Sequence, residues 1–407
     1  RRAELELNLR NAVGIALMTI KGPASLVAEQ SSARAMELCQ RPGINFEQIS
    51  LAFRGAYFAH LSRPDVRKAG ETAVELLALA EEHGSADRIA ATLNWLGLAR
   101  LLSGEFELAA QDLDRAWALL ESMAKPAISL PQLRAGGMPK TPTIELTSRV
   151  ESQAFNRIYS AWNLWFLGYP DRALDQISIA TAIAHDSGSK VVQVVVHDYA
   201  TNVYELRREL DHTRERAEAT LALSAELGNV IRRVMSEILL GWADAMAGDL
   251  DGGIARMRQY MLVLKAAGSE IRADYNLARI ATALGRIGRF DEGLRTIGES
   301  FPFIERSGQR SYEAEVHRLK GELLLAQDGS NAAQAEHSLR TAIDISRKQH
   351  AKSWELRATT SLARLLLQQG KCDEARAMLA EIYNWFTEGF DTADLKDAKA
   401  LLDELNA

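Results

Sequence analysis

Hydrophobic residues recur at intervals of three and four along most of the chain, as in "RIAATLNWLGLARLL" and "AAQDLDRAWALL". This spacing places them on one face of an α-helix. No stretch sustains the alternation of apolar and polar residues that marks a β-strand. The pattern therefore predicts an all-α protein with essentially no sheet.

The helical segments carry a repeated marker of the form Gly-x-(aromatic or Leu)-x-x-small, clearest in "GEFELA", "GYPDRA" and "GRFDEG". Most copies lie about 40 residues apart. The small residue of each copy, strong or weak, is Ala28, Ala69, Ala109, Ala173, Thr213, Gly253, Gly293, Ala335 or Ala375. A second marker follows 15 residues later in most copies, at Gly43, Gly84, Gly188, Gly228, Gly268, Gly308 and His350. Two markers in register predict a ~40-residue repeat present about nine times.

Each repeat is interpreted as a helical hairpin. The first Gly ends helix A, because Gly accepts the left-handed geometry of a helix C-cap. An acidic residue then opens helix B, where a carboxylate suits the positive end of the helix dipole. The small residue lets the two helices approach, and the second Gly ends helix B. This is the tetratricopeptide pattern with longer helices, and it predicts an α-solenoid with an inner groove. HEAT or armadillo pairs share the period but do not explain the Gly-x-aromatic marker.

The repeats predict one continuous superhelical domain. Repeats 1 to 3 occupy residues 1–124 and repeats 4 to 9 occupy residues 149–390. Residues 125–148 read as an inserted loop, since they contain Pro and Gly without helical periodicity. Their substring "GGMPKT" lacks the directly joined Gly-Lys-Ser/Thr of a phosphate-binding loop. Residues 391–407 are expected to form a C-terminal capping helix.

The capping helix is predicted from an apolar stripe opposite a charged face. Its buried stripe is expected to be Leu395, Ala398, Leu402 and Leu405. Asp394, Asp397 and Glu404 fall on another face and are expected to point outward, because a terminal repeat must present a polar surface.

Composition limits the partners. The 407 residues carry a net charge of −6, which argues against direct nucleic-acid binding. No apolar run approaches the ~20 residues of a membrane-spanning helix. The two cysteines, Cys39 and Cys372, are too few for a disulfide framework, so reduced thiols and a cytoplasmic location are expected.

A search for catalytic or metal chemistry finds little. The closest approach to a metal pair is Glu313 with His317, one helical turn apart, and two ligands leave a metal site open. No nucleophile elbow, Cys-x-x-Cys or dinucleotide fingerprint is present. We therefore predict no catalytic residue, no metal and no cofactor for this chain, and no independent enzyme.

Binding in the groove is the more natural use of a solenoid. The helix A positions that line a tetratricopeptide groove give the candidates Arg54, Asn94, Trp162, Trp165, Asp198, Asn202, Glu205, Trp242, Tyr275 and Arg364. Aromatic and polar groups together suit a protein or peptide partner, or a small inducer. Two alternatives stay open. Trp162 and Trp165 serve equally well as interhelical packing, and the face shared by Asp198, Asn202 and Glu205 as a solvated surface.

Several stretches resemble a known bacterial family. They are "LGYPDRAL", "RERAEATLALSAELG", "EAEVHRLKGELLL", "AKSWELRATTSLARLLLQQGK" and "WFTEGFDTADLKDAKALLDEL". They are similar to the C-terminal repeat region of ATPase-coupled class III adenylate or guanylate cyclases and related winged-helix regulators. The resemblance covers nearly the whole chain except the predicted insert.

That resemblance implies a sensor or regulatory arm. In such proteins an effector and a P-loop ATPase of the signal-transduction type precede the repeats in the same polypeptide. The absence of an initial Met agrees with a segment of a longer protein. The family supplies no ligand and no functional residue to transfer. Two other hypotheses stay open: a contribution of Asp198, Asn202 and the terminal carboxylates to nucleotide chemistry, or a free-standing scaffold.

Overall fold

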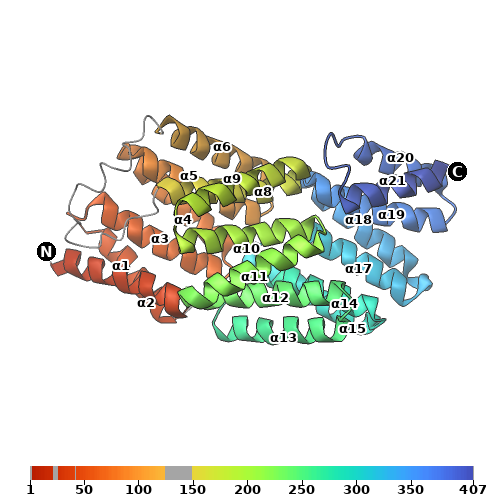
Figure 1. Ribbon diagram of the computed structural model, residues 1–407, viewed down its shortest axis with the longest axis horizontal. Coiled ribbons are helices and arrows are strands. Elements are labelled where there is room, and N and C mark those ends of the chain that lie inside the picture. The colour runs from red at the N-terminus through yellow and green to blue at the C-terminus, as the bar shows by residue number, and fades with distance from the viewer. Residues whose placement is uncertain (1, 22–25, 42, 124–148, 407) are drawn as a thin grey trace.

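The computed structural model describes residues 2–21, 26–41, 43–123 and 149–406. Within these ranges the chain is helical and contains no strand. The predicted insert, residues 125–148, lies outside the described residues. No helix in the described part is long and apolar enough to span a membrane. The helices stack side by side from one end of an elongated molecule to the other (Figure 1).

In the described ranges the helices pair into nine successive hairpins. Their first helices are α1 (Arg2–Lys21), α3 (Phe46–Ser62), α5 (Ala86–Leu102), α8 (Arg149–Leu167), α10 (Lys190–Leu206), α12 (Val230–Met246), α14 (Ala273–Arg286), α17 (Glu313–Gln327) and α19 (Lys352–Gln368). Their second helices are α2 (Leu26–Cys39), α4 (Val66–Glu82), α6 (Phe106–Ser122), α9 (Pro170–Asp186), α11 (Leu210–Leu227), α13 (Leu250–Ala266), α15 (Phe290–Gly298) continued by α16 (Ser300–Ser307), α18 (Ala332–Lys348) and α20 (Cys372–Tyr383). The short 3-10 helix η1 (Gly329–Asn331) joins α17 to α18, and α21 (Ala393–Asn406) closes the chain. The predicted all-α solenoid with a C-terminal capping helix is confirmed.

The marker residues end the helices as their chemistry requires. Gly228 caps α11 in the left-handed region, with φ of 66°. His350, at the same place in the eighth hairpin, has φ of 56°. Arg208 replaces the first marker Gly in the fifth hairpin and also adopts a positive φ, 64°. The repeat geometry therefore imposes this conformation even on residues that disfavour it.

The small marker residues hold the hairpins closed. Ala69, Ala109, Ala173, Thr213, Ala335 and Ala375 are all fully buried. In the sixth hairpin a Cβ built on Gly253 would lie only 2.4 Å from the carbonyl oxygen of Gly241 on the facing helix. A larger side chain there would force α12 and α13 apart.

Successive turns of the superhelix touch each other with a step of five hairpins. The first hairpin meets the sixth where α1 packs on α12. The second meets the seventh where Ser269 Oγ donates to the carbonyl oxygen of Ser62 at 3.2 Å. The third meets the eighth where the amides of Arg310 and Ser311 donate to the carbonyl oxygen of Leu102 at 2.8 and 3.2 Å. We call these the inter-turn contacts.

The same step continues to the C-terminal end. Ser353 of the ninth hairpin donates from its hydroxyl to the carbonyl oxygen of Trp165 in the fourth. The ring of Trp165 packs edge-on against Trp354 with centroids 4.7 Å apart. The fifth hairpin then meets α21, where Arg208 pairs with Asp397 at 2.7 Å. The capping helix thus takes the place that the first helix of a tenth hairpin would occupy.

The capping helix buries the predicted apolar stripe, but one residue of its predicted outer face points inward. Leu395, Ala398, Leu402 and Leu405 are all buried. The prediction that Asp394 points outward is wrong, because its side chain is 13% exposed and its carboxylate accepts from Arg357 at 2.8 Å. The superhelix coils tightly, so the start of α21 lies against its inner wall, beside Arg357.

Candidate functional site

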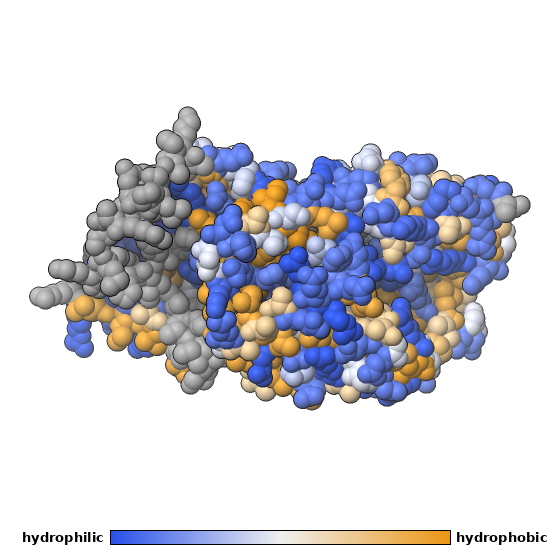
Figure 2. Space-filling model, viewed as in Figure 1, coloured by the Kyte–Doolittle hydropathy of each residue, from blue (hydrophilic) through white to orange (hydrophobic). Residues whose placement is uncertain are grey.

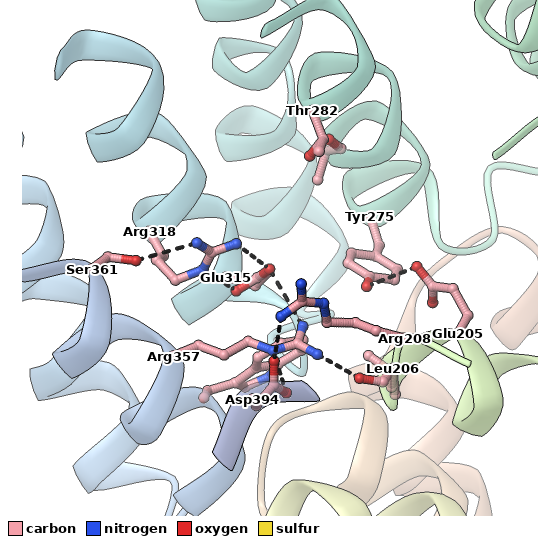
Figure 3. A network of polar contacts seen from close by, with 12 residues as sticks. Glu205, Leu206, Arg208, Tyr275, Thr282, Glu315, Arg318, Arg357, Ser361 and Asp394 are labelled. Atoms are coloured by element: carbon pink, nitrogen blue, oxygen red, sulfur yellow. Dashed lines mark hydrogen bonds and ion pairs between the residues drawn. The ribbon is translucent and has the colours of Figure 1, made fainter. Parts of the chain in front are cut away.

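The concave side of the C-terminal half holds a cavity of about 600 Å³. Its walls come from the turn between α10 and α11 and from α12, α14, α15, α17, α19 and α21. It contains six arginines, namely Arg208, Arg279, Arg286, Arg318, Arg357 and Arg364. Its five carboxylates are Glu205, Glu315, Glu322, Asp394 and Asp397. Most of these charged groups are tied into two networks, part of which Figure 3 shows.

The first network joins the fifth hairpin to the seventh. The carboxylate of Glu205 accepts from the Tyr275 hydroxyl at 3.0 Å and from Arg279 Nη2 at 3.0 Å. Arg279 also donates to the side-chain oxygen of Asn276 at 2.6 Å. Burial raises the pKa of Tyr275 well above its ordinary value, so the phenol stays a donor. All four side chains of this network are buried.

The second network joins the eighth and ninth hairpins to the capping helix. Glu315 accepts two hydrogen bonds from Arg318, each at 2.7 Å, and lies 3.6 Å from Arg357. Burial alone raises the pKa of the Glu315 carboxyl, but Arg318 and Arg357 outweigh it and hold that pKa below its usual value. Arg357 also donates to the carbonyl oxygen of Leu206, so it bridges three parts of the coil (Figure 3).

Two arginines of the cavity are not engaged in this way. Arg286, at the end of α14, and Arg364, on α19, are exposed. Neither forms an ion pair with a carboxylate of the described residues. The cavity is also lined by apolar side chains, among them Trp242, Met246 and Phe290.

The structure brings four of the ten sequence candidates into this cavity. They are Glu205, Trp242, Tyr275 and Arg364. Asn94 lies instead at a buried joint, where it donates to the carbonyl oxygen of Ser152 at 2.9 Å. Arg54 is half-buried between neighbouring hairpins, and burial lowers the pKa of its guanidinium. As ligand contacts, all ten stay predictions.

The remaining candidates carry packing between hairpins. Trp162 and Trp165 are 1% and 2% exposed, so the interhelical alternative describes their position. Asp198 and Asn202 are also buried, and the solvated-face alternative is wrong for them. Asp198 pairs with Arg232, and the side-chain oxygen of Asn202 accepts from Arg272 at 2.6 Å.

Several cavity residues escaped the sequence reasoning. Arg208, Leu210, Arg286 and Phe290 lie at or beside the turns between the two helices of a hairpin. The groove rule counts only selected positions along the first helix, so it omits the residues of the turns and also Arg286 at the end of α14. The prediction for Asp394 of α21 is wrong for a similar reason. The turns between the helices and the capping helix line the same cavity because of the pitch of the superhelix, which the repeat pattern does not give.

Nothing in the described part of the chain groups three or more metal-ligating side chains. The lining of the cavity contains neither histidine nor cysteine. The lining combines guanidinium donors, carboxylates, hydroxyls and apolar surface.

Comparisons with known proteins bear on the fold. No protein-family model matches the chain. An uncharacterized protein of Rhizobium meliloti (strain 1021) is 25% identical over 221 residues, which are 52% of this chain and 20% of that protein. The chain thus spans about a fifth of the length of the curated relative it matches.

Solved structures are similar over almost the whole chain. A Rap protein complexed with competence and sporulation factor has a TM-score of 0.60 at 10% identity, covering 98% of this chain and 99% of that one. The fold is a tetratricopeptide-like α-solenoid. A signal-transduction ATPase with a tetratricopeptide repeat sensor, from Pyrococcus horikoshii, reaches only 0.43 at 12% identity, over 93% of this chain and 54% of that one. At such identities the likeness concerns the fold alone.

Proposed function

We propose that this chain is a non-catalytic sensor and protein-interaction module that binds a peptide segment or small inducer in the cavity. The observation that carries the proposal is the cavity itself, whose walls combine apolar side chains with two guanidiniums that pair with no carboxylate of the described residues. Pockets of a few hundred Å³ that combine apolar walls with a few polar groups are typical of ligand sites. A Rap protein of similar fold is known in complex with competence and sporulation factor, which supports a binding role.

We further propose that the module is the regulatory arm of a larger cytoplasmic signalling protein. Its ATPase and effector, a nucleotidyl cyclase or a winged-helix domain, would lie upstream in the same polypeptide. The resemblance of the repeats and the much greater length of the Rhizobium relative support this reading. Regulation of this kind requires that the ligand bind two states of the whole protein with different affinity.

The alternative role in nucleotide chemistry finds less support. Asp198 and Asn202 are 2% and 0% exposed, Asp198 Oδ2 pairs with Arg232, and the side-chain oxygen of Asn202 accepts from Arg272. A nucleotide would have to break these contacts before it reached either side chain.

The test uses the parent polypeptide. Removal of residues 1–407 is expected to uncouple the ATPase and effector output from its stimulus, while the effector keeps its basal turnover. The matched control is Asp344→Asn, at an exposed position on α18 outside the cavity. Unchanged output and unchanged stimulation after removal would refute the regulatory role.

A further inference from the structure

The charge of the cavity is nearly balanced but not fully. Four of its six arginines have acidic partners: Arg279 with Glu205, Arg318 with Glu315 and Glu322, Arg357 with Asp394, and Arg208 with Asp397. These pairs use all five carboxylates of the lining. With no lysine in the walls, the lining keeps a surplus of one positive charge.

The surplus is the difference between two unpaired arginines, with two positive charges, and the paired groups, whose five carboxylates outnumber their four arginines by one. Arg286 and Arg364 lie in the same cavity and have no carboxylate partner among the described residues. The neighbouring hydroxyls do not compete with them as donors. The hydroxyls of Thr282 and Thr360 donate hydrogen bonds to backbone carbonyl oxygens of their own helices, at 2.9 and 2.8 Å. The free donors that meet a ligand are therefore mainly guanidinium N–H groups, which suit a carboxylate.

The same cavity also offers apolar surface. Trp242 is 8% exposed, and Met246 and Phe290, which also line the cavity, are half-buried. A ligand that satisfied the arginines alone would leave this surface in contact with water. A ligand with one apolar side chain next to its anionic group would use both walls.

We propose that the cavity binds a short peptide segment in which a carboxylate stands next to a large apolar side chain. Either Arg286 or Arg364 pairs with the carboxylate, and either Trp242 or Phe290 contacts the apolar side chain. A volume of about 600 Å³ matches a ligand of a few residues. A single negative charge balances the surplus, whereas a phosphate with nearly two charges overfills it beside five carboxylates. This inference rests on the proposed binding function and adds the ligand class.

The experiment uses the full chain and an array of synthetic hexapeptides. Every peptide that contains Glu beside Leu or Phe has a twin with Gln in place of Glu, and a second twin with phosphoserine. We expect the tightest binders to be Glu peptides, with Gln twins at least tenfold weaker. The double variant Arg286→Gln/Arg364→Gln is expected to lose at least tenfold for Glu peptides and little for Gln twins.

The control variant is Arg233→Gln/Arg295→Gln, which removes two exposed arginines outside the cavity. It is expected to bind like the unaltered chain. Since all four positions are exposed, thermal unfolding should not distinguish the two variants, and this is checked first. Equal binding of Gln twins, tighter binding of phosphoserine twins, or unchanged binding by the cavity variant overturns the ligand class but leaves a binding module standing. Absence of any binding, together with unaltered output after removal of the chain from its parent, overturns the proposed function as well.

Discussion

The pair formed by Glu205 and Arg279 is the most deeply buried charge pair of the cavity, with side chains 2% and 1% exposed. Glu205→Gln keeps the shape but leaves Arg279 without a counter-ion. Loss of one partner of such a pair costs about 3–5 kcal/mol. We expect a lower denaturation midpoint and faster hydrogen exchange in α10 and α14. The double variant Glu205→Gln/Arg279→Met should recover most of the loss, and a single variant as stable as the unaltered chain would contradict this role.

The burial of Asp274 predicts that the stability of the molecule depends on pH. It is fully buried, and burial raises its pKa from 3.8 to about 7. Between these values the folded state holds a proton that the unfolded state has released. Stability is therefore expected to fall as pH rises from about 4 to 7, by at most ~1.4 kcal/mol per unit, and to stay low above.

Asp274→Asn removes this slope. The variant should be more stable than the unaltered chain at pH 8 and differ less at pH 5, as measured by urea denaturation at both values. Asp344→Asn, at an exposed position of α18, should change neither midpoint. A variant that keeps the original slope would show that another group carries the pH dependence.

At the scale of the element, α21 is both a cap and a wall of the cavity. A chain that ends at Asp391 loses the buried side chains Leu395, Leu401, Leu402 and Leu405. Each buried leucine contributes roughly 1.5–3 kcal/mol, so the ninth hairpin should become markedly less stable. Hydrogen exchange is expected to accelerate in α19 and α20, and dye binding to apolar surface should increase. Lys399→Ala, which removes only an exposed pair with Asp403, should do neither.

The helices and their ends were predictable because their causes are local. A Gly that ends a helix, or an Ala that lets two helices touch, acts on residues of the same repeat, so its effect can be read from that repeat's sequence. The arginine networks were not predictable in this way. Arg357 meets Leu206 and Asp394 across separate hairpins, and their distance depends on the pitch of the coil. The length of the repeat does not determine the pitch of the superhelix. Counting groove positions along single helices therefore identified only part of the cavity lining.

At the scale of the whole molecule, the number of hairpins between inter-turn contacts should matter more than their individual sequences. Deletion of residues 229–268 removes one full repeat and leaves the flanking hairpins able to stack. The step of five is then broken for Ser62 with Ser269 and for Leu102 with Arg310. We expect a larger radius of gyration by small-angle X-ray scattering, whereas replacement of the same residues by a second copy of 189–228 should preserve it.

The inter-turn contacts also give the coil a mechanical character. A solenoid whose windings are apart lengthens like an open spring, because only the stacking of neighbours resists extension. Here each winding is fastened to the next at Ser62, Leu102, Trp165 and Arg208. A pull or twist at one end therefore acts first on these inter-turn contacts, and the last of them, at Arg208, also lines the cavity. A twist applied at the end of the coil and a ligand in the cavity would thus act on the same contact, Arg208 with Asp397.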